Sequence, residues 1–409
     1  MGMLLSQACG KVPNKTPTIL LVSGWQDVNI GDIAHTPGLL EVLRTFVPEA
    51  RIILWKKRVE HKQVEPLIMS NYPNVKIVHG QVNDQYKVES KEVLEAFEKS
   101  HLMIHGSGPG IVGQDNLWAW VKYTNKPFGV FGTTIADVND HLRDLLKQAL
   151  FIYTRETKSL EVLQQQDVTG PLMGFAPDAT FFLNIHNDQL ANRFLKANSL
   201  KAGEYICVIP RLRYTPYHRI RRDNNWSQEK IAQVESTNQQ HKEADHAKLR
   251  EAMITWIRET GHQVLVCPER TYQVNIMDEL LVSPLPDDVR PSVIKRGYWL
   301  PDETASVYRQ AFAVLSFECH SPIIALANGT PAFYLRQPED TIKGQMYYDL
   351  ELSDWVFEIE QTEGQEIANA LMTIWENAQL AEQRVEQVQS QIESIYRSCC
   401  DPINDMLLT

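Results

Sequence analysis

The sequence lacks the features that mark membrane, disulfide-rich or nucleic-acid-binding proteins. No stretch approaches the roughly 18 consecutive apolar residues of a spanning helix, so we expect no integral membrane segment. The six cysteines include no Cys-x-x-Cys pair, which argues against a disulfide framework and structural zinc and is typical of reduced thiols in a cytoplasmic protein. Cations are also in deficit: 40 Lys and Arg face 51 Asp and Glu, a formal charge of −11. This balance argues against a nucleic-acid partner, because phosphate backbones are held by an excess of cations.

Short apolar runs and amphipathic stretches alternate along the chain from Thr18 onward. The 409 residues, 43% apolar and 22% charged, are enough for two or three globular domains. The alternation is typical of βα units that feed a mostly parallel sheet. Strands are expected at 18–22, 51–55, 75–79, 102–105, 128–131 and 150–153, and helices at 33–46, 91–99, 141–149 and 157–166.

The pattern starts again after a polar stretch at residues 184–203. Strands are expected there at 205–209, 264–267, 292–295, 313–317, 331–335 and 355–357. We therefore predict an α/β fold of two Rossmann-like domains. The expected boundaries are a disordered N-terminus at 1–17, domains at 18–190 and 204–362, and a C-terminal helical segment at 363–409.

Two other segments depart from the alternation. Residues 214–245 are polar without a strand pattern, and a segment of this length is expected to be functional, mobile or a local insertion. Within residues 366–397, apolar side chains recur every three or four positions, which predicts one long helix or a pair. We expect this helix to pack across both domains rather than to bind a partner, although a homo-oligomer is possible.

The turn after the first predicted strand is a first candidate for a site, because ligands of doubly wound sheets bind at the carboxyl ends of the strands. In this turn, Asn29 precedes Gly31, which allows close backbone approach, and Asp32, which can cap the following helix. The segment has no G-x-G-x-x-G fingerprint, so a dinucleotide site is not indicated. An ordinary capped turn remains an equally good interpretation.

A glycine-rich loop after the fourth predicted strand is the second candidate. The residues at issue are His105, Gly106, Ser107 and Gly108. Closely spaced glycines let backbone amides converge on an anion or a glycan hydroxyl. A structural role remains the alternative for His105.

Five arginines and one histidine, without any acid, lie between residues 211 and 222. Arg211 and Arg213 directly follow the first strand of the second domain, and we expect them to hold a carboxylate or phosphate. Tyr214 is a candidate stacking surface for a sugar. The arginines at 219–222 are expected to form a solvated loop instead.

The last candidates, Glu318 and His320, follow the predicted strand at 313–317. A carboxylate and an imidazole at the carboxyl end of a sheet form a plausible acid–base pair. Further along the chain, Lys343 is a candidate partner for an anionic ligand.

Taken in order, these motifs resemble the polysaccharide pyruvyl transferase family over residues 18–343. The matching residues are Asn29-x-Gly31-Asp32, Gly106 to Gly110, Tyr153-Thr-Arg155-Glu156 with Ser159 and Leu163, Pro177-Asp178 with Phe181, His320, Gly329-x-Pro331 and Lys343. The resemblance implies a glycosyltransferase-B-like arrangement with the acceptor on the N-terminal domain and the donor on the C-terminal domain. It also implies phosphoenolpyruvate as donor and co-substrate, a glycan diol as acceptor, a pyruvate ketal as product, and no other cofactor or metal.

The resemblance also implies roles for individual residues. His320 takes the place of the family's Arg-x-His histidine and is the expected acid. Lys343 and Arg211 or Arg213 are expected at the donor, and Asp32 or Glu318 is the expected base. Glu318 stands where the family has an arginine, which puts an anion where an anionic donor is expected.

Two other functions remain open. The first is a nucleotide-sugar-dependent glycosyltransferase of the same fold, in which the cations would hold a diphosphate. The second is a non-catalytic protein that binds a glycan or an anionic metabolite, which the anion at Glu318 makes credible.

Overall fold

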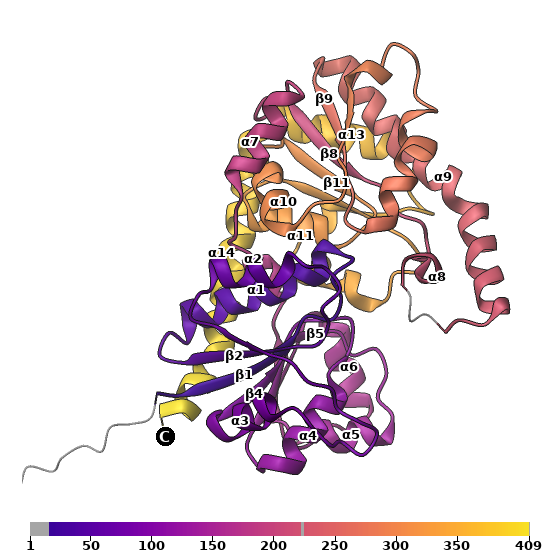
Figure 1. The fold of residues 1–409 in the computed structure, drawn as a ribbon. Coiled ribbons are helices and arrows are strands. Elements are labelled where there is room, and N and C mark those ends of the chain that lie inside the picture. The colour runs from indigo at the N-terminus through magenta and orange to yellow at the C-terminus, as the bar shows by residue number, and fades with distance from the viewer. Residues whose placement is uncertain (1–15, 222–224, 409) are drawn as a thin grey trace, which may run out of the picture.

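The protein contains two parallel α/β domains joined along one face, and a pair of C-terminal helices closes the chain (Figure 1). The computed structural model describes residues 16–221 and 225–408. Most of the predicted disordered N-terminus and Arg222 of the cationic stretch lie outside the described residues.

The first sheet has seven parallel strands in the order β3-β2-β1-β4-β5-β6-β7. Its strands are β1 (Thr18–Ser23), β2 (Arg51–Lys56), β3 (Lys76–Val78), β4 (Leu102–His105), β5 (Phe128–Thr133), β6 (Phe151–Thr154) and β7 (Leu172–Phe175). Its helices are α1 (Ile30–Phe46), α2 (Val64–Asn71), α3 (Lys91–Lys99), α4 (Gln114–Thr124), α5 (Asp140–Leu146), α6 (Thr157–Gln165) and the 3-10 turn η1 (Ala179–Phe182). The edge strand β7 was not predicted; its four residues, Leu172–Phe175, are exposed or only partly buried.

The second sheet has six parallel strands in the order β10-β9-β8-β11-β12-β13. Its strands are β8 (Tyr205–Ile209), β9 (Gln263–Val266), β10 (Val293–Lys295), β11 (Ala313–Ser316), β12 (Ala332–Arg336) and β13 (Val356–Glu358). Its helices include α8 (Tyr217–Ile220), α9 (Gln228–Thr260), α10 (Pro301–Tyr308), α11 (His320–Ala327), α12 (Gln345–Asp349) and the 3-10 turn η2 (Thr271–Asn275). The predicted α/β class with two parallel sheets is confirmed.

Much of the predicted polar segment at 214–245 is helical. Helix α9 spans 33 residues, from a cap in which the Ser227 side chain accepts from the Lys230 amide to Gly261 with φ of 70°. The periodicity is weak because the amino-terminal half of α9 buries few side chains, among them Val234, and projects away from the domain (Figure 1). The polar stretch at 184–203 likewise contains a helix, α7 (Asp188–Ala197), which packs against α10.

The C-terminal segment is a pair of helices, α13 (Gly364–Glu376) and α14 (Ala378–Leu408). Helix α14 runs back along both domains (Figure 1). The Tyr396 hydroxyl donates to the carbonyl of Asp178 in the first domain at 2.7 Å, and the Gln389 side-chain amide donates to that of Leu326 in the second domain at 2.7 Å. This arrangement confirms the prediction that the segment packs across both domains.

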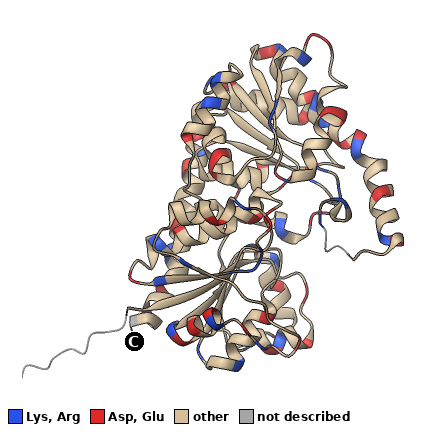
Figure 2. Cartoon of the chain, viewed as in Figure 1, with Lys and Arg blue, Asp and Glu red and all other residues tan. Residues whose placement is uncertain are grey.

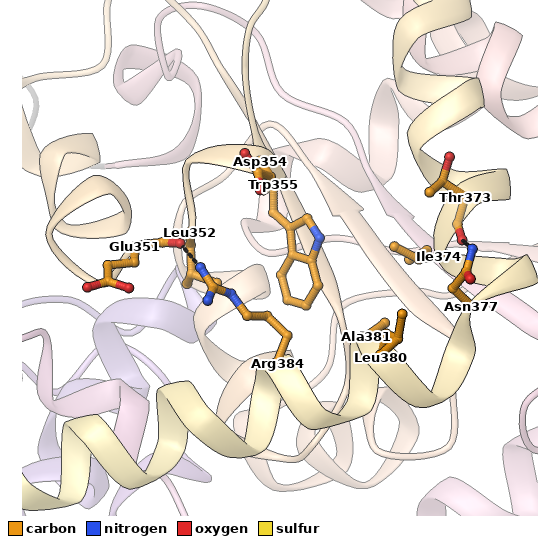
Figure 3. A pocket seen from close by; sticks show the side chains of 10 residues that line it. All are labelled: Glu351, Leu352, Asp354, Trp355, Thr373, Ile374, Asn377, Leu380, Ala381 and Arg384. Atoms are coloured by element: carbon orange, nitrogen blue, oxygen red, sulfur yellow. Dashed lines mark hydrogen bonds between the residues drawn. The ribbon is translucent and has the colours of Figure 1, made fainter.

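A surface hollow lies at the bend between α13 and α14 (Figure 3). Trp355 and Leu380 line it, and Arg384 donates to the backbone carbonyl of Glu351 at its edge. Among the residues that the structure describes, no helix is both long and apolar enough to cross a membrane.

The carboxyl ends of the two sheets face each other across the domain interface. The loop after β1 and the loop after β9 are joined by backbone hydrogen bonds, from the Ile30 amide to the Glu269 carbonyl at 2.9 Å and from the Thr271 amide to the Val28 carbonyl at 3.1 Å. Residues that follow strands in either domain therefore meet at one place.

Candidate functional site

His320 lies at this meeting point, as the first residue of α11. Its Nδ1 is 3.3 Å from Oε1 of Glu269, and its Nε2 is 3.0 Å from Nε2 of His35 and 3.6 Å from Oδ2 of Asp178. Burial alone would lower the pKa of His320, but Cys319 and the two carboxylates outweigh burial and raise it well above its usual value. His320 therefore lies between residues of both domains in surroundings that favour the protonated form of its ring.

The turn at Asn29 to Asp32 packs directly against His320. A Cβ atom at Gly31 would overlap with the His320 ring, so the close approach that this glycine permits is to a side chain of the other domain. The helix cap is Asn29, whose side chain accepts from the Gly31 amide at 2.8 Å, and not Asp32 as the sequence suggested. The Asp32 carboxylate accepts from Gln26 instead.

Strand register brings Arg211 and Glu318 together. Ile209 of β8 is aligned with Ser316 of β11, and each charged residue lies two positions beyond. The guanidinium of Arg211 is 3.6 Å from Glu318 and donates to Asp340 at 2.6 Å.

Two further cations share the same carboxylates. Arg270 donates to Glu318 at 2.8 Å, and Lys343 lies 3.3 Å from Asp340. The pKa of Asp340 is lowered, because Arg211 and Lys343 outweigh the effect of its burial. We call Arg211, Arg270, Lys343 and His320 the cation layer.

The little surface that this cluster retains belongs mainly to the cations. The side chains of the cation layer are 7–12% exposed, whereas Glu318, Asp340 and Glu269 are fully buried behind them. The expectation that Glu318 presents an anion to the donor is therefore not supported. Its charge is compensated by Arg270 and Arg211, and Gln273 also donates to it at 2.8 Å.

Arg213 and Tyr214 are engaged elsewhere. Arg213 makes a bidentate pair with Asp245 of α9, at 2.9 and 3.0 Å, and a third bond to Glu360 at 2.7 Å. Tyr214 is half-buried, and its amide donates to Asn238 of α9. These contacts give Arg213 a structural role, in contrast to the expected ligand contact.

The glycine-rich loop is filled by the protein itself. His105 stacks on Trp25, and its Nε2 accepts from the Gly113 amide at 3.0 Å. Burial lowers the pKa of His105 to about 3, so the ring is neutral. Trp25 Nε1 donates to the carbonyl of Ser107, and a Cβ at Gly108 would meet the same indole.

Ser107 also makes contacts inside the first domain. Its hydroxyl accepts from the amide of Ala179 at 3.0 Å, and a Cβ at Gly106 would lie 3.1 Å from the Ser23 hydroxyl oxygen. The loop is thus a packing element beside the site, because the Trp25 indole and the Ala179 amide already contact it.

The sequence analysis did not single out His35, Glu269 or Arg270 as site residues. Glu269 and Arg270 follow β9, so their position after a strand was the available signal. His35 had no such signal, because it lies inside α1 and meets His320 only when the two domains dock. Figure 2 shows acidic and basic residues close together where the domains meet.

Comparisons with known proteins agree with this architecture. A UDP-GlcNAc 2-epimerase from Neisseria meningitidis, bound to UDP-GlcNAc, is similar with a TM-score of 0.55 and 10% identity, over 95% of this chain and 100% of that one. A glycosyltransferase from Rickettsia africae is similar with a TM-score of 0.59 and 11% identity, over 96% and 99%. At such identities the likeness shows the fold, which is glycosyltransferase-B-like.

The sequence comparisons differ in outcome. No curated protein matches the chain. The family model for polysaccharide pyruvyl transferase matches residues 29–337, which include His320, Arg211, Arg270 and the loop after β9 at the domain interface. The chain therefore belongs to the polysaccharide pyruvyl transferase family.

Proposed function

We propose that the protein transfers the pyruvyl group of phosphoenolpyruvate to a diol of a glycan and forms a pyruvate ketal. The observation that carries this proposal is the cation layer, in which three permanently charged side chains and one raised-pKa histidine cover buried carboxylates. Phosphoenolpyruvate carries about three negative charges near neutral pH. A ligand of this size and charge fits a compact group of cations that an otherwise acidic protein keeps at one place.

The proposed role of His320 is that of general acid. It delivers a proton to the methylene carbon of the donor, which makes the adjacent carbon electrophilic. One sugar hydroxyl attacks that carbon, the second hydroxyl closes the ketal, and phosphate leaves. One hydroxyl proton passes through the base and replaces the proton that the acid gave to the methylene carbon, and the other departs with phosphate, so protons balance without an added reactant.

The proposed base is Asp32 rather than Glu318. Glu318 is fully buried and paired with two arginines, so it is not free to accept a proton from a sugar. Asp32 belongs to the N-terminal domain, which we propose as the acceptor side, and packs in the turn next to His320. Arg211, Arg270 and Lys343 would neutralise the leaving phosphate.

The proposed compartment is the cytoplasm. The five cysteines that the structure describes are all free thiols, which fits a reducing environment.

Release of phosphate from phosphoenolpyruvate in the presence of a panel of glycans tests the proposal. NMR of the product would show the methyl group of a ketal in an amount equal to the phosphate released. Phosphate release without a ketal, or ketal formation by an Arg211→Ala variant at the wild-type rate, would contradict it.

A further inference from the structure

His35, Asp178 and His320 form a cluster with the geometry of a transition-metal site. Their ligand atoms, the two Nε2 atoms and Oδ2 of Asp178, all lie within 4.8 Å of one another, and all three residues are buried. The individual separations are 3.0 Å between the two Nε2 atoms, 3.2 Å from His35 to Asp178 and 3.6 Å from His320 to Asp178.

These separations of 3.0–3.6 Å lie on either side of those expected for one face of a tetrahedral metal site. Zinc binds imidazole nitrogen and carboxylate oxygen at about 2.0–2.2 Å, and tetrahedral angles then put the ligand atoms about 3.3–3.5 Å apart. Two imidazoles and a carboxylate are also an established ligand set for zinc that keeps its fourth position open.

The surrounding backbone holds the ligands in place. A Cβ at Gly38 of α1 would overlap with the Ala179 carbonyl, so the helix and η1 touch backbone to backbone and bring His35 against Asp178. Gly31 allows the same close contact to His320. The site therefore exists only when the two domains are docked.

The contacts around the three possible ligands resemble those around histidines that bind a metal. Nδ1 of His320 faces Glu269, as the second nitrogen of a ligating imidazole commonly faces a carboxylate. The two contacts of the His35 ring, to Asp178 and to His320, are both made by Nε2, so this nitrogen is aimed at the shared point. Arg155 donates to Oδ2 of Asp178 at 2.7 Å and fixes the carboxylate.

The carboxylates next to the imidazoles are partly compensated. Asp178 and Glu269 touch the imidazoles, Arg155 pairs with Asp178, and Arg270 lies close enough to Glu269 to help lower its pKa. The inference therefore rests on the geometry of the three ligand atoms and not on an excess of negative charge.

We infer that His35, Asp178 and His320 bind one divalent transition-metal ion, such as Zn²⁺, at the domain interface. This goes beyond the proposed reaction, in which His320 acts as the acid. An Nε2 atom that binds a metal ion cannot also carry a proton, so the bound ion would prevent His320 from acting as an acid through that nitrogen.

Metal titration of the whole chain, purified without a histidine tag and freed of metal by a chelator, tests the inference independently of any transferase activity. Zn²⁺ is titrated by calorimetry, and Co²⁺ by its visible absorption, which is strong when the ion is tetrahedral. We expect one ion per chain and at least tenfold weaker binding in His35→Ala. A His79→Ala variant, which removes an exposed histidine that faces Glu65, should bind as the wild type does.

A second variant distinguishes the loss of the metal ligand from a loss of folding. His35→Gln keeps the size and polarity of the side chain but removes the imidazole ligand, and it should lose the tetrahedral Co²⁺ spectrum while its circular dichroism stays unchanged. Absence of binding by the wild type, or equal binding by the wild type and a folded His35 variant, would overturn the inference.

Discussion

Replacing Gly31 with alanine tests whether this residue is fixed by packing against His320. At an exposed helical position, glycine to alanine stabilises a helix by about 1 kcal/mol. Here the added Cβ would lie closer than 3.0 Å to the His320 ring, a separation that such atoms essentially never show, so the ring or α1 must move. We expect net destabilisation of about 1–3 kcal/mol, the usual cost of overpacking.

Catalysis should respond more strongly than stability. A displacement of the catalytic group by about 1 Å costs on the order of 100-fold in rate, so Gly31→Ala should lose activity even where it remains folded. Urea denaturation measures the loss of stability, and phosphate release measures the loss of activity. Gly110→Ala is the matched control, because a Cβ there meets nothing within 4 Å. If Gly31→Ala were as stable and active as the wild type, the contact with His320 would not be a constraint.

The remaining predictions concern charges around the cation layer. Arg211→Lys should weaken binding of phosphoenolpyruvate about tenfold, which is equivalent to one lost charge-assisted hydrogen bond of about 1.4 kcal/mol. Arg213→Lys should leave the affinity for phosphoenolpyruvate within about twofold of the wild type, because Asp245 already binds the Arg213 guanidinium. Calorimetric titration would check both, and equal losses would contradict the distinction. Asp340 has a folded-state pKa below its unfolded value of about 3.9, so its contribution to stability is present above that pH and is lost as the pH falls through the folded pKa. The difference in urea stability between the wild type and Asp340→Asn should accordingly shrink below about pH 4, and a constant difference would refute the assignment.

The sequence predicted the elements of the site better than their contacts. Positions after apolar strands correctly placed Arg211, Glu318 and His320 at the carboxyl end of a parallel sheet, because strand order and register follow from the buried runs. Which carboxylate pairs with which cation depends on the loops between these strands. Arg213 illustrates this, since its partner Asp245 lies on a helix that the polar composition of residues 214–245 did not reveal.

Contacts between domains were the least predictable part. His35 and His320 are 285 positions apart, and their side chains meet only because Gly31 and Gly38 let the backbones approach. The sequence marked Gly31 as a site of close approach but did not show that the approaching group was His320. The glycine-rich loop had the composition of an anion site, but Trp25 and its neighbours occupy it.

Binding of phosphoenolpyruvate to the purified protein is the most direct measurement of the proposed donor. Calorimetric titration with phosphoenolpyruvate and with a panel of nucleotide sugars should show saturable binding of phosphoenolpyruvate at one site per chain, weakened in Arg211→Lys. Saturable heat only from a nucleotide sugar would indicate a glycosyltransferase. Absence of heat from either ligand would indicate a non-catalytic binding protein, and both results would contradict pyruvyl transfer.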